Sequence, residues 1–150
     1  MVLEYFNSKL ITYIEGNPTK NEALKILVDL IRNNSDVLKD EKHFYENILA
    51  REELGSTGIG QGIAIPHARS EKIEKLVIAV GLLRNKVDFN SPDGERIKLI
   101  VLVGAPKGQN REYLSLVSEL MRTFRDKNLR ENIICADNYQ ELLEAISELK

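Results

Sequence analysis

Two runs of almost entirely apolar residues occupy the second half of the chain, at residues 76–83 and 97–103. Both are short and rich in Val, Ile and Leu, as in strands that are buried on both faces of a sheet. Residues 90–94 read Asn-Ser-Pro-Asp-Gly, a turn sequence that lets the two strands pair as neighbours. A third β-type run lies at residues 10–14. The pattern therefore predicts a sheet that helices cover on both faces.

Elsewhere the apolar positions recur every three or four residues, as on one face of an amphipathic helix. Thr19 and Glu22 form a capping-box pattern at the start of one such helix, and Asn138 and Glu141 repeat it near the end of the chain. The predicted helices cover residues 19–32, 40–53, 111–124, 129–133 and 138–149. Together the elements predict an α/β fold, a three-layer α/β/α sandwich with a mixed sheet.

The composition limits both the number of domains and the kinds of partner. The chain has 150 residues, 43% of them hydrophobic, and we find no repeat or linker, so we expect a single domain over residues 1–150. Its net charge is −2 and no basic stripe is present, which argues against nucleic acid as a partner. This mixed surface charge suits a monomer or a weak dimer.

The chain lacks the sequence signals of a membrane or secreted protein. No apolar run approaches the ~20 residues that cross a bilayer, so any link to a membrane is expected to run through a permease partner. Cys135 is the only cysteine and cannot form an internal disulfide, and the N-terminus has no signal-peptide pattern. We therefore expect a cytoplasmic protein, with Cys135 buried as a small apolar residue.

A glycine-rich segment lies near the middle of the chain. Such a segment turns tightly and leaves backbone N–H groups open to an anion, which predicts a phosphate-binding loop. It superficially resembles a dinucleotide fingerprint, but that motif follows a strand and opens a helix, the reverse of the order here. The glycines are Gly55, Gly58, Gly60 and Gly62.

His67 follows this segment directly. The apolar run Ile63–Ile65 predicts a short strand, and Pro66 stiffens the backbone just before the histidine. A neutral imidazole, with an ordinary pKa of ~6.5, has a lone pair that can attack phosphorus. Taken alone, a histidine after proline is more often a packed or capping residue than a catalytic one. The other histidine, His43, is expected on the surface of its helix, and no cluster at metal-ligand spacing accompanies it, so no metal is predicted.

The segment as a whole resembles the signature of a known family, the fructose/mannitol-type IIA domains of the bacterial phosphoenolpyruvate-dependent phosphotransferase system. Nitrogen-regulatory IIA proteins share this signature. The length of the chain and the order of its predicted elements also fit over nearly its whole extent. The matching residues are Arg51, Glu52, Leu54, Ser56, Thr57, Gly58, Gly60, Ile63-Ala64-Ile65 and Pro66-His67.

The resemblance implies a phosphocarrier in which His67 accepts a phosphoryl group from the phosphohistidine of the carrier protein HPr or its nitrogen-branch relative. In sugar-transport members the group passes to a cysteine of a IIB domain, whereas nitrogen-regulatory members bind regulatory targets in one phosphorylation state. Such a protein-histidine phosphotransferase needs no cofactor beyond the donor protein.

The resemblance also assigns residues around the phosphoryl group. Arg51 matches the family arginine whose guanidinium pairs with the phosphoryl oxygens, although taken alone it reads as a charge that neutralises a helix end. Ser56, Thr57 and Gly58 are candidate loop contacts. Ser56 and Thr57 are not expected to react, because no base is placed beside them in the sequence.

One position departs from the family pattern. Members usually carry a second histidine on the helix after the last core strand, where this chain has Tyr113. A phenol donates a hydrogen bond but cannot become cationic. Tyr113 is either a site residue or a core tyrosine with its hydroxyl at the rim. An alternative function is therefore a regulatory binding module that does not transfer, and a third is a small-anion or nucleotide-binding enzyme that uses the glycine loop.

Overall fold

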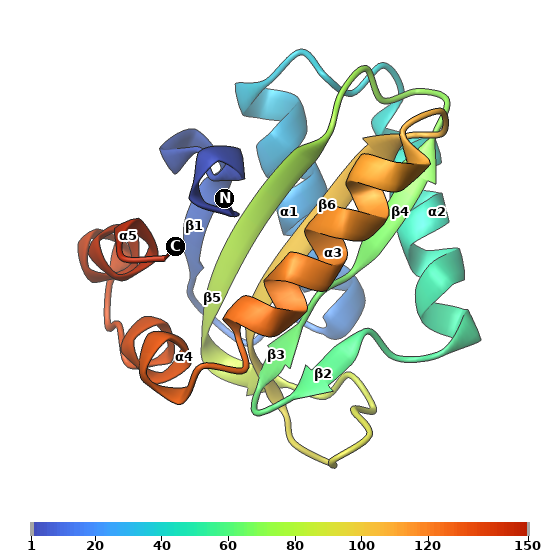
Figure 1. Cartoon of the computed structure of the whole chain (residues 1–150). Coiled ribbons are helices and arrows are strands. Elements are labelled where there is room, and N and C mark those ends of the chain that lie inside the picture. The colour runs from blue at the N-terminus through green and yellow to red at the C-terminus, as the bar shows by residue number, and fades with distance from the viewer. Residues whose placement is uncertain (1, 150) are drawn as a thin grey trace.

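The two long apolar runs form antiparallel strands at the centre of a six-stranded mixed sheet (Figure 1). The structure is a computed structural model that describes residues 2–149. The strands are β1 (Ile11–Ile14), β2 (Gly58–Gly60), β3 (Ile63–Ala64), β4 (His67–Ser70), β5 (Val77–Val87) and β6 (Ile97–Pro106). β1 lies parallel to β5, whereas β3 and β4 lie parallel to successive parts of β6, and β2 pairs antiparallel with β3.

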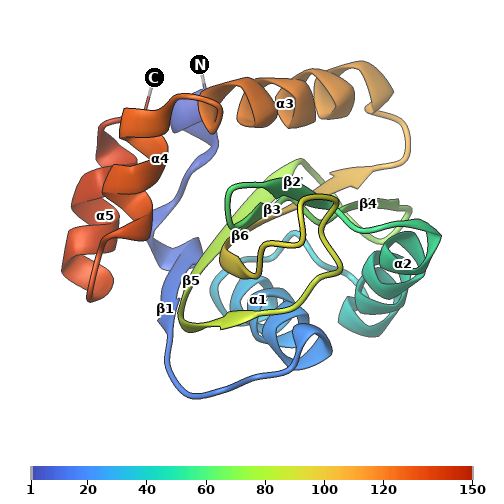
Figure 2. The same cartoon turned by 90° about the horizontal axis from the view of Figure 1, so that it is seen from below.

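Helices cover both faces of this sheet, as the sequence predicts. They are α1 (Lys20–Asn34), α2 (Glu41–Leu54), α3 (Asn110–Thr123), α4 (Lys127–Ile134) and α5 (Tyr139–Ser147), with short 3-10 turns η1 (Val2–Tyr5) and η2 (Ser8–Leu10). Figure 2 shows α1 and α2 on one face, α3 on the other, and α4 and α5 beside the edge formed by β1. Within residues 2–149 no helix has the length and apolar character needed to cross a bilayer.

Strand alternation divides the buried side chains between two cores. Ile78, Val80 and Leu82 of β5 point into the core beneath α3, α4 and α5. Ala79 and Leu83 of the same strand point into the core beneath α1 and α2. Because successive strand residues face opposite sides, a nearly all-apolar strand is the expected sequence of a sheet covered twice. The three-layer prediction is confirmed.

Local capping signals fix the helix starts. The Thr19 hydroxyl accepts from the backbone N–H of Glu22 at 3.2 Å, and the Glu22 carboxylate accepts from the Thr19 N–H at 2.8 Å, which is the predicted capping box. At α5 the Asn138 side chain accepts from the Glu141 N–H at 2.9 Å. The Glu141 carboxylate instead accepts from the N–H of Asp137 at 3.0 Å, so that box is only half formed.

Some boundaries and exposures differ from the sequence prediction. β5 continues past residue 83 to Val87 as a strand whose residues 84–86 are exposed, so no apolar run marks it. The short strands β2 and β4 were not predicted. Cys135 is exposed, because the inward positions at the end of α4 belong to its neighbours Ile133 and Ala136. The expectation that Cys135 is buried is therefore wrong.

The first turn of α2 packs closely on the sheet beside β4. Gly104 of β6 pairs with Ala68 of β4, and a Cβ at Gly104 would lie 2.8 Å from Cζ of the buried Phe44 of α2. Real Cβ atoms do not tolerate such a contact, so glycine is needed for this packing distance. The packing therefore sets how close the first turn of α2 lies to β6 and to its partner strand β4.

Candidate functional site

His67 is the first residue of β4, and backbone contacts fix its position. It pairs with Val103 in the parallel register, and the Val103 N–H donates to the Pro66 carbonyl at 2.8 Å. Nδ1 of the half-buried His67 ring lies 2.7 Å from the Ile65 carbonyl oxygen. Because a carbonyl only accepts, Nδ1 carries the proton of the neutral ring, and Nε2 keeps the lone pair.

The surroundings of His67 favour this neutral ring. Burial lowers the pKa of His67 below its ordinary value, and the Arg51 charge lowers it further. The hydrogen bond to the Ile65 carbonyl and the Glu52 carboxylate act in the opposite direction. Because burial is the largest of these influences, the ring is neutral at pH 7 and presents an unprotonated Nε2.

Arg51 lies in the last turn of α2. Its Nη1 donates to the Gly55 carbonyl at 2.7 Å, so the arginine closes the helix end, where a positive charge also complements the helix dipole. Among residues 2–149 no carboxylate forms an ion pair with Arg51. Its charge is not neutralised, and the remaining N–H groups of the guanidinium are available to an anion.

His67, Arg51 and Tyr113 line one cavity of about 660 Å³, formed by α2, β4 and the first turn of α3 with the loop that precedes it. The structure thus brings together three of the residues that the sequence singles out. Positive charge predominates along this cavity, because only one carboxylate accompanies its three cations. The other lining residues are Asn47, Ala50, Glu53, Leu54, Ala68, Arg69 and Lys107.

Tyr113 belongs both to the core and to the cavity. Its side chain is buried against the core beneath α3, and its ring centroid lies 5.8 Å from that of His67 at an angle of 58°. Burial raises the pKa of Tyr113, while the charges of Arg69 and Arg51 lower it. No group within residues 2–149 forms a hydrogen bond with the Tyr113 hydroxyl. The two readings of Tyr113 are therefore compatible in this structure.

The structure does not bring Ser56, Thr57 and Gly58 to the lining of the cavity. The buried Thr57 hydroxyl donates to the Glu52 carboxylate, which also forms an ion pair with Lys20 Nζ at 2.7 Å. The Ser56 hydroxyl oxygen accepts from the Gly58 N–H at 3.0 Å. These contacts hold the loop after α2 in place, and a direct role in binding a phosphoryl group stays a prediction for all three residues.

The glycines further along this loop make a turn of the hairpin between β2 and β3. Gly60, Gln61 and Gly62 have φ values of 93°, 60° and 81°, which glycine adopts readily and glutamine rarely. The Gln61 N–H donates to the Asp93 carboxylate at 3.0 Å, and this bond lowers the pKa of Asp93. The Gln61 N–H of this turn is thus occupied by a side chain of the same chain. Whether other N–H groups of the glycine-rich segment bind phosphate stays a prediction.

The other histidine lies outside the cavity. His43 of α2 is half-buried, and its Nδ1 lies 2.7 Å from the hydroxyl oxygen of Ser70, the last residue of β4. Its expected place on the surface of α2 is therefore only partly correct. Within residues 2–149 no group of three or more His, Cys, Asp and Glu side chains is arranged to hold a metal ion.

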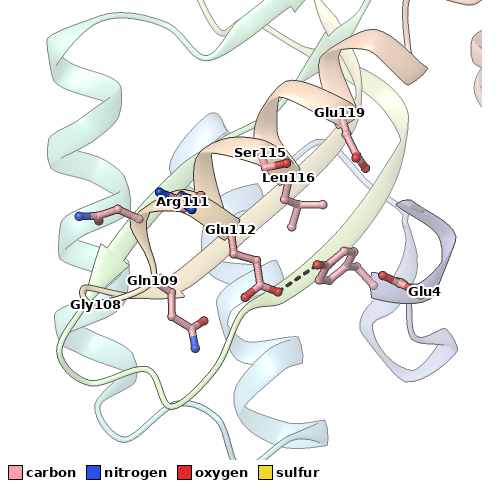
Figure 3. Close-up of a pocket in the computed structure, with 10 residues that line it drawn as sticks. Glu4, Gly108, Gln109, Arg111, Glu112, Ser115, Leu116 and Glu119 are labelled. Carbon is pink, nitrogen blue, oxygen red and sulfur yellow. Dashed lines mark hydrogen bonds between the residues drawn. The ribbon is translucent and has the colours of Figure 1, made fainter.

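A second pocket, of about 470 Å³, lies beside α3 next to η1 (Figure 3). Glu112 of α3 reaches across it and accepts a hydrogen bond from the Tyr5 hydroxyl at 3.0 Å. Glu4 and Glu119 also line it, with Arg111 as the one basic residue among its lining. This excess of negative charge makes the pocket unsuited to a phosphoryl group, in contrast to the cavity at His67.

The sequence pattern alone does not single out Arg69 for this site. The residue lies two positions after His67 in β4, and side chains at i and i+2 of a strand point to the same face. The signal was therefore present, but it becomes readable only once residues 67–70 are known to form a strand.

Comparisons with known proteins agree with the fold. Residues 4–149 match the family described as "Phosphoenolpyruvate-dependent sugar phosphotransferase system, EIIA 2". The PTS system fructose-specific EIIABC component of Bacillus subtilis is 33% identical over 111 residues, which cover 74% of this chain but 18% of that protein. A nitrogen regulatory protein of Pseudomonas aeruginosa is 32% identical over 132 residues, which cover 88% of this chain and 85% of that protein.

A solved structure agrees over almost the whole chain. It is the nitrogen regulatory protein IIA-Ntr from Neisseria meningitidis, which is 28% identical in sequence. The TM-score is 0.83, and the match covers 97% of this chain and 98% of that protein.

Proposed function

Because the chain belongs to the EIIA 2 family of the phosphoenolpyruvate-dependent sugar phosphotransferase system, we propose that it carries a phosphoryl group on Nε2 of His67. The donor in this proposal is the phosphohistidine of a carrier protein of the HPr type. The observation that supports it best is the hydrogen bond from Nδ1 to the Ile65 carbonyl. This bond leaves Nε2 as the nucleophilic nitrogen, and the lowered pKa keeps it unprotonated at pH 7.

The proposed transfer needs no separate base. The lone pair of Nε2 forms a bond to phosphorus while the bond from phosphorus to the donor nitrogen breaks, and the pair of that bond stays on the donor ring. The proton on Nδ1 remains hydrogen-bonded to the Ile65 carbonyl, so the phosphorylated ring is at first cationic. Arg51 supplies a guanidinium to the phosphoryl oxygens, where negative charge is spread in the transition state.

Two onward routes are compatible with the relatives. A fructose-specific relative suggests delivery of the group to a cysteine of a IIB domain, and the nitrogen regulatory relatives suggest a regulatory protein whose binding depends on phosphorylation. For both routes the proposed docking face is the one around the cavity. Leu54 supports this choice, because it lines the cavity and is an apolar residue that is 86% exposed.

A second candidate function is a regulatory module that binds targets without transferring phosphate. Tyr113 favours it, because a neutral phenol stabilises a phosphohistidine less than a cation does at the same place. We rank this candidate second, because His67, Arg51 and the positive cavity together suit a phosphoryl group.

The test is phosphorylation of the whole protein. Incubation with phosphoenolpyruvate, enzyme I and HPr is expected to add the mass of one phosphate through a bond that is labile in acid and stable in alkali. His67→Gln is expected to abolish this addition, and His43→Gln, outside the cavity, to retain it. An unchanged mass of the unaltered protein would contradict the proposal and favour the regulatory module.

A further inference from the structure

Arg69 shares one face of β4 with His67. The strand runs from His67 to Ser70, and the side chains of the alternate residues Ala68 and Ser70 are buried. The Arg69 side chain is exposed and lines the cavity beside His67. Strand geometry therefore directs a guanidinium to the same side as the imidazole, two residues along a rigid backbone.

Contacts from two helices hold Arg69. Its Nη1 donates to the Asn110 side-chain oxygen at the start of α3, and its guanidinium carbon lies 5.4 Å from the centroid of the Tyr113 ring. On the backbone side, the Asn47 amide of α2 donates to the Arg69 carbonyl at 3.1 Å. The guanidinium is therefore oriented by neutral groups.

The charge of Arg69 has no counter-ion among residues 2–149. Two other arginines form ion pairs, Arg84 with Glu15 at 2.6 Å and Arg32 with Glu41 at 3.2 Å. Arg69 resembles Arg51 in this respect, since each donates only to an uncharged oxygen within residues 2–149. Unpaired guanidinium groups on one cavity are the arrangement that a doubly charged anion requires.

We infer that Arg69 contacts the phosphoryl group on His67 as a second catalytic guanidinium, and that Asn110 and Tyr113 are positioning residues that hold it. The inference rests on the proposed function. Arg69 donates hydrogen bonds to the phosphoryl oxygens and transfers no proton, so the bonds made and broken at phosphorus are those described above.

In this arrangement Tyr113 has a positioning role for which its side chain need not be charged. α2 and α3 pack on opposite faces of the sheet, so Arg51 and the pair Tyr113–Asn110 approach the cavity from opposite layers (Figure 2). On the α3 side the cation is the guanidinium of Arg69 from β4, which Asn110 and Tyr113 of α3 contact. Tyr113 serves as the aromatic surface under the guanidinium and packs against the His67 ring.

The experiment measures the rate at which His67 of the whole protein is phosphorylated, with phosphoramidate as a small donor and with phosphorylated HPr as a protein donor. Arg69→Gln is expected to lower both rates by about tenfold or more. Arg69→Lys keeps the charge but loses the planar guanidinium, so we expect its rates to lie between those of the unaltered protein and those of Arg69→Gln. The matched control Arg122→Gln, an exposed arginine in the last turn of α3, is expected to stay within about twofold.

A double-mutant cycle separates positioning from general packing. Asn110→Ala is expected to slow phosphorylation in the unaltered protein but to have no further effect in the Arg69→Gln background, because its contribution runs through Arg69. Thermal unfolding of each variant checks that the fold is retained. Equal effects of Asn110→Ala in the two backgrounds would overturn its positioning role.

The remaining outcomes distinguish this inference from the proposed function. If His67 is phosphorylated and Arg69→Gln reacts as fast as Arg122→Gln, the role of Arg69 is refuted and the proposed function stands. If His67 takes up phosphate from neither donor, both proposals fail. A loss confined to the protein donor would mean that Arg69 binds the carrier and does not contact the phosphoryl group, which also refutes the inference.

Discussion

The two histidines of the chain contact β4 at opposite ends, and their partners differ. His67 begins the strand and donates from Nδ1 to a backbone carbonyl, whereas His43 of α2 bonds to the hydroxyl of Ser70, which ends it. Both rings are half-buried, so exposure alone does not distinguish them. A carbonyl accepts only and fixes the tautomer, but a hydroxyl donates or accepts and leaves it open. The proton fixed on Nδ1 of His67 leaves the lone pair on Nε2, the nitrogen that can act as a nucleophile.

The surroundings extend this difference. His67 lines a cavity with unpaired guanidinium groups, and nothing within residues 2–149 is hydrogen-bonded to its Nε2. Ser70 is fully buried, and its hydroxyl oxygen also accepts from the Lys72 N–H at 3.0 Å. The His43 end of β4 is therefore tied to structure, and the His67 end is available to a ligand.

The largest expected effect concerns stability at the His43 end. Ser70→Ala removes the partner of both His43 Nδ1 and the Lys72 N–H, which should lower the free energy of unfolding by about 1–3 kcal/mol. Urea unfolding measures this loss. Ser118→Ala, at an exposed serine of α3, is the control and should stay within about 0.5 kcal/mol of the unaltered protein. Equal stabilities of the two variants would contradict a structural role for the hydrogen bonds of Ser70 at the His43 end of β4.

The sequence predicts most of the fold because the signals are local or periodic. The box of Thr19 and Glu22 lies within one helical turn, and the apolar runs of β5 and β6 need no partner to be recognised. β4 was missed because it has four residues and its pairing with β6 is set by contacts more than thirty residues away. Arg69 was missed with it, since its alignment with His67 depends on that strand.

The glycine-rich loop shows what local composition cannot predict. Its composition predicts open N–H groups, but composition does not reveal which anion they meet. In the structure the Gln61 N–H meets the Asp93 carboxylate from the turn before β6. His67 and Arg51 were found because the family motif carries them together, and the structure places both on one cavity. Which backbone N–H groups of the loop are already occupied is a property of the tertiary structure.

The second prediction concerns the pKa of His67, which burial and Arg51 lower. In a His43→Gln background, which leaves a single imidazole, the NMR shift of the ring should report a pKa below ~6.5. Arg51→Gln removes a charge that disfavours the protonated ring, so the pKa should rise towards that value, whereas Arg122→Gln should leave it unchanged. A pKa unmoved by Arg51→Gln would show that the guanidinium lies away from the ring.

The same shift has a consequence for stability. Because the pKa of His67 is lower in the folded than in the unfolded protein, the unfolded state binds more protons between the two values. The contribution of His67 to the free energy of unfolding is fully present above the unfolded pKa of ~6.5. It is lost as the pH falls from that value through the lower pKa of the folded protein. In His67→Gln this loss of unfolding free energy at low pH should be absent, as urea unfolding at a series of pH values would measure. If the loss persisted in that variant, it would belong to another titrating group.

The smallest expected effect sharpens the electrostatic side of the comparison. Burial raises the pKa of Tyr113, and the nearby Arg69 charge opposes that rise because it favours the phenolate. Arg69→Gln should therefore raise the pKa of Tyr113 further. The Cζ resonance of Tyr113, assigned by its loss in Tyr113→Phe, measures this change. The effect is small because Arg69 is exposed and its charge is screened by water. An unchanged pKa would mean that the guanidinium does not stay over the ring in solution. The positive surroundings of His67 would then depend mainly on Arg51, because Lys107 forms an ion pair with Glu71 at 3.5 Å.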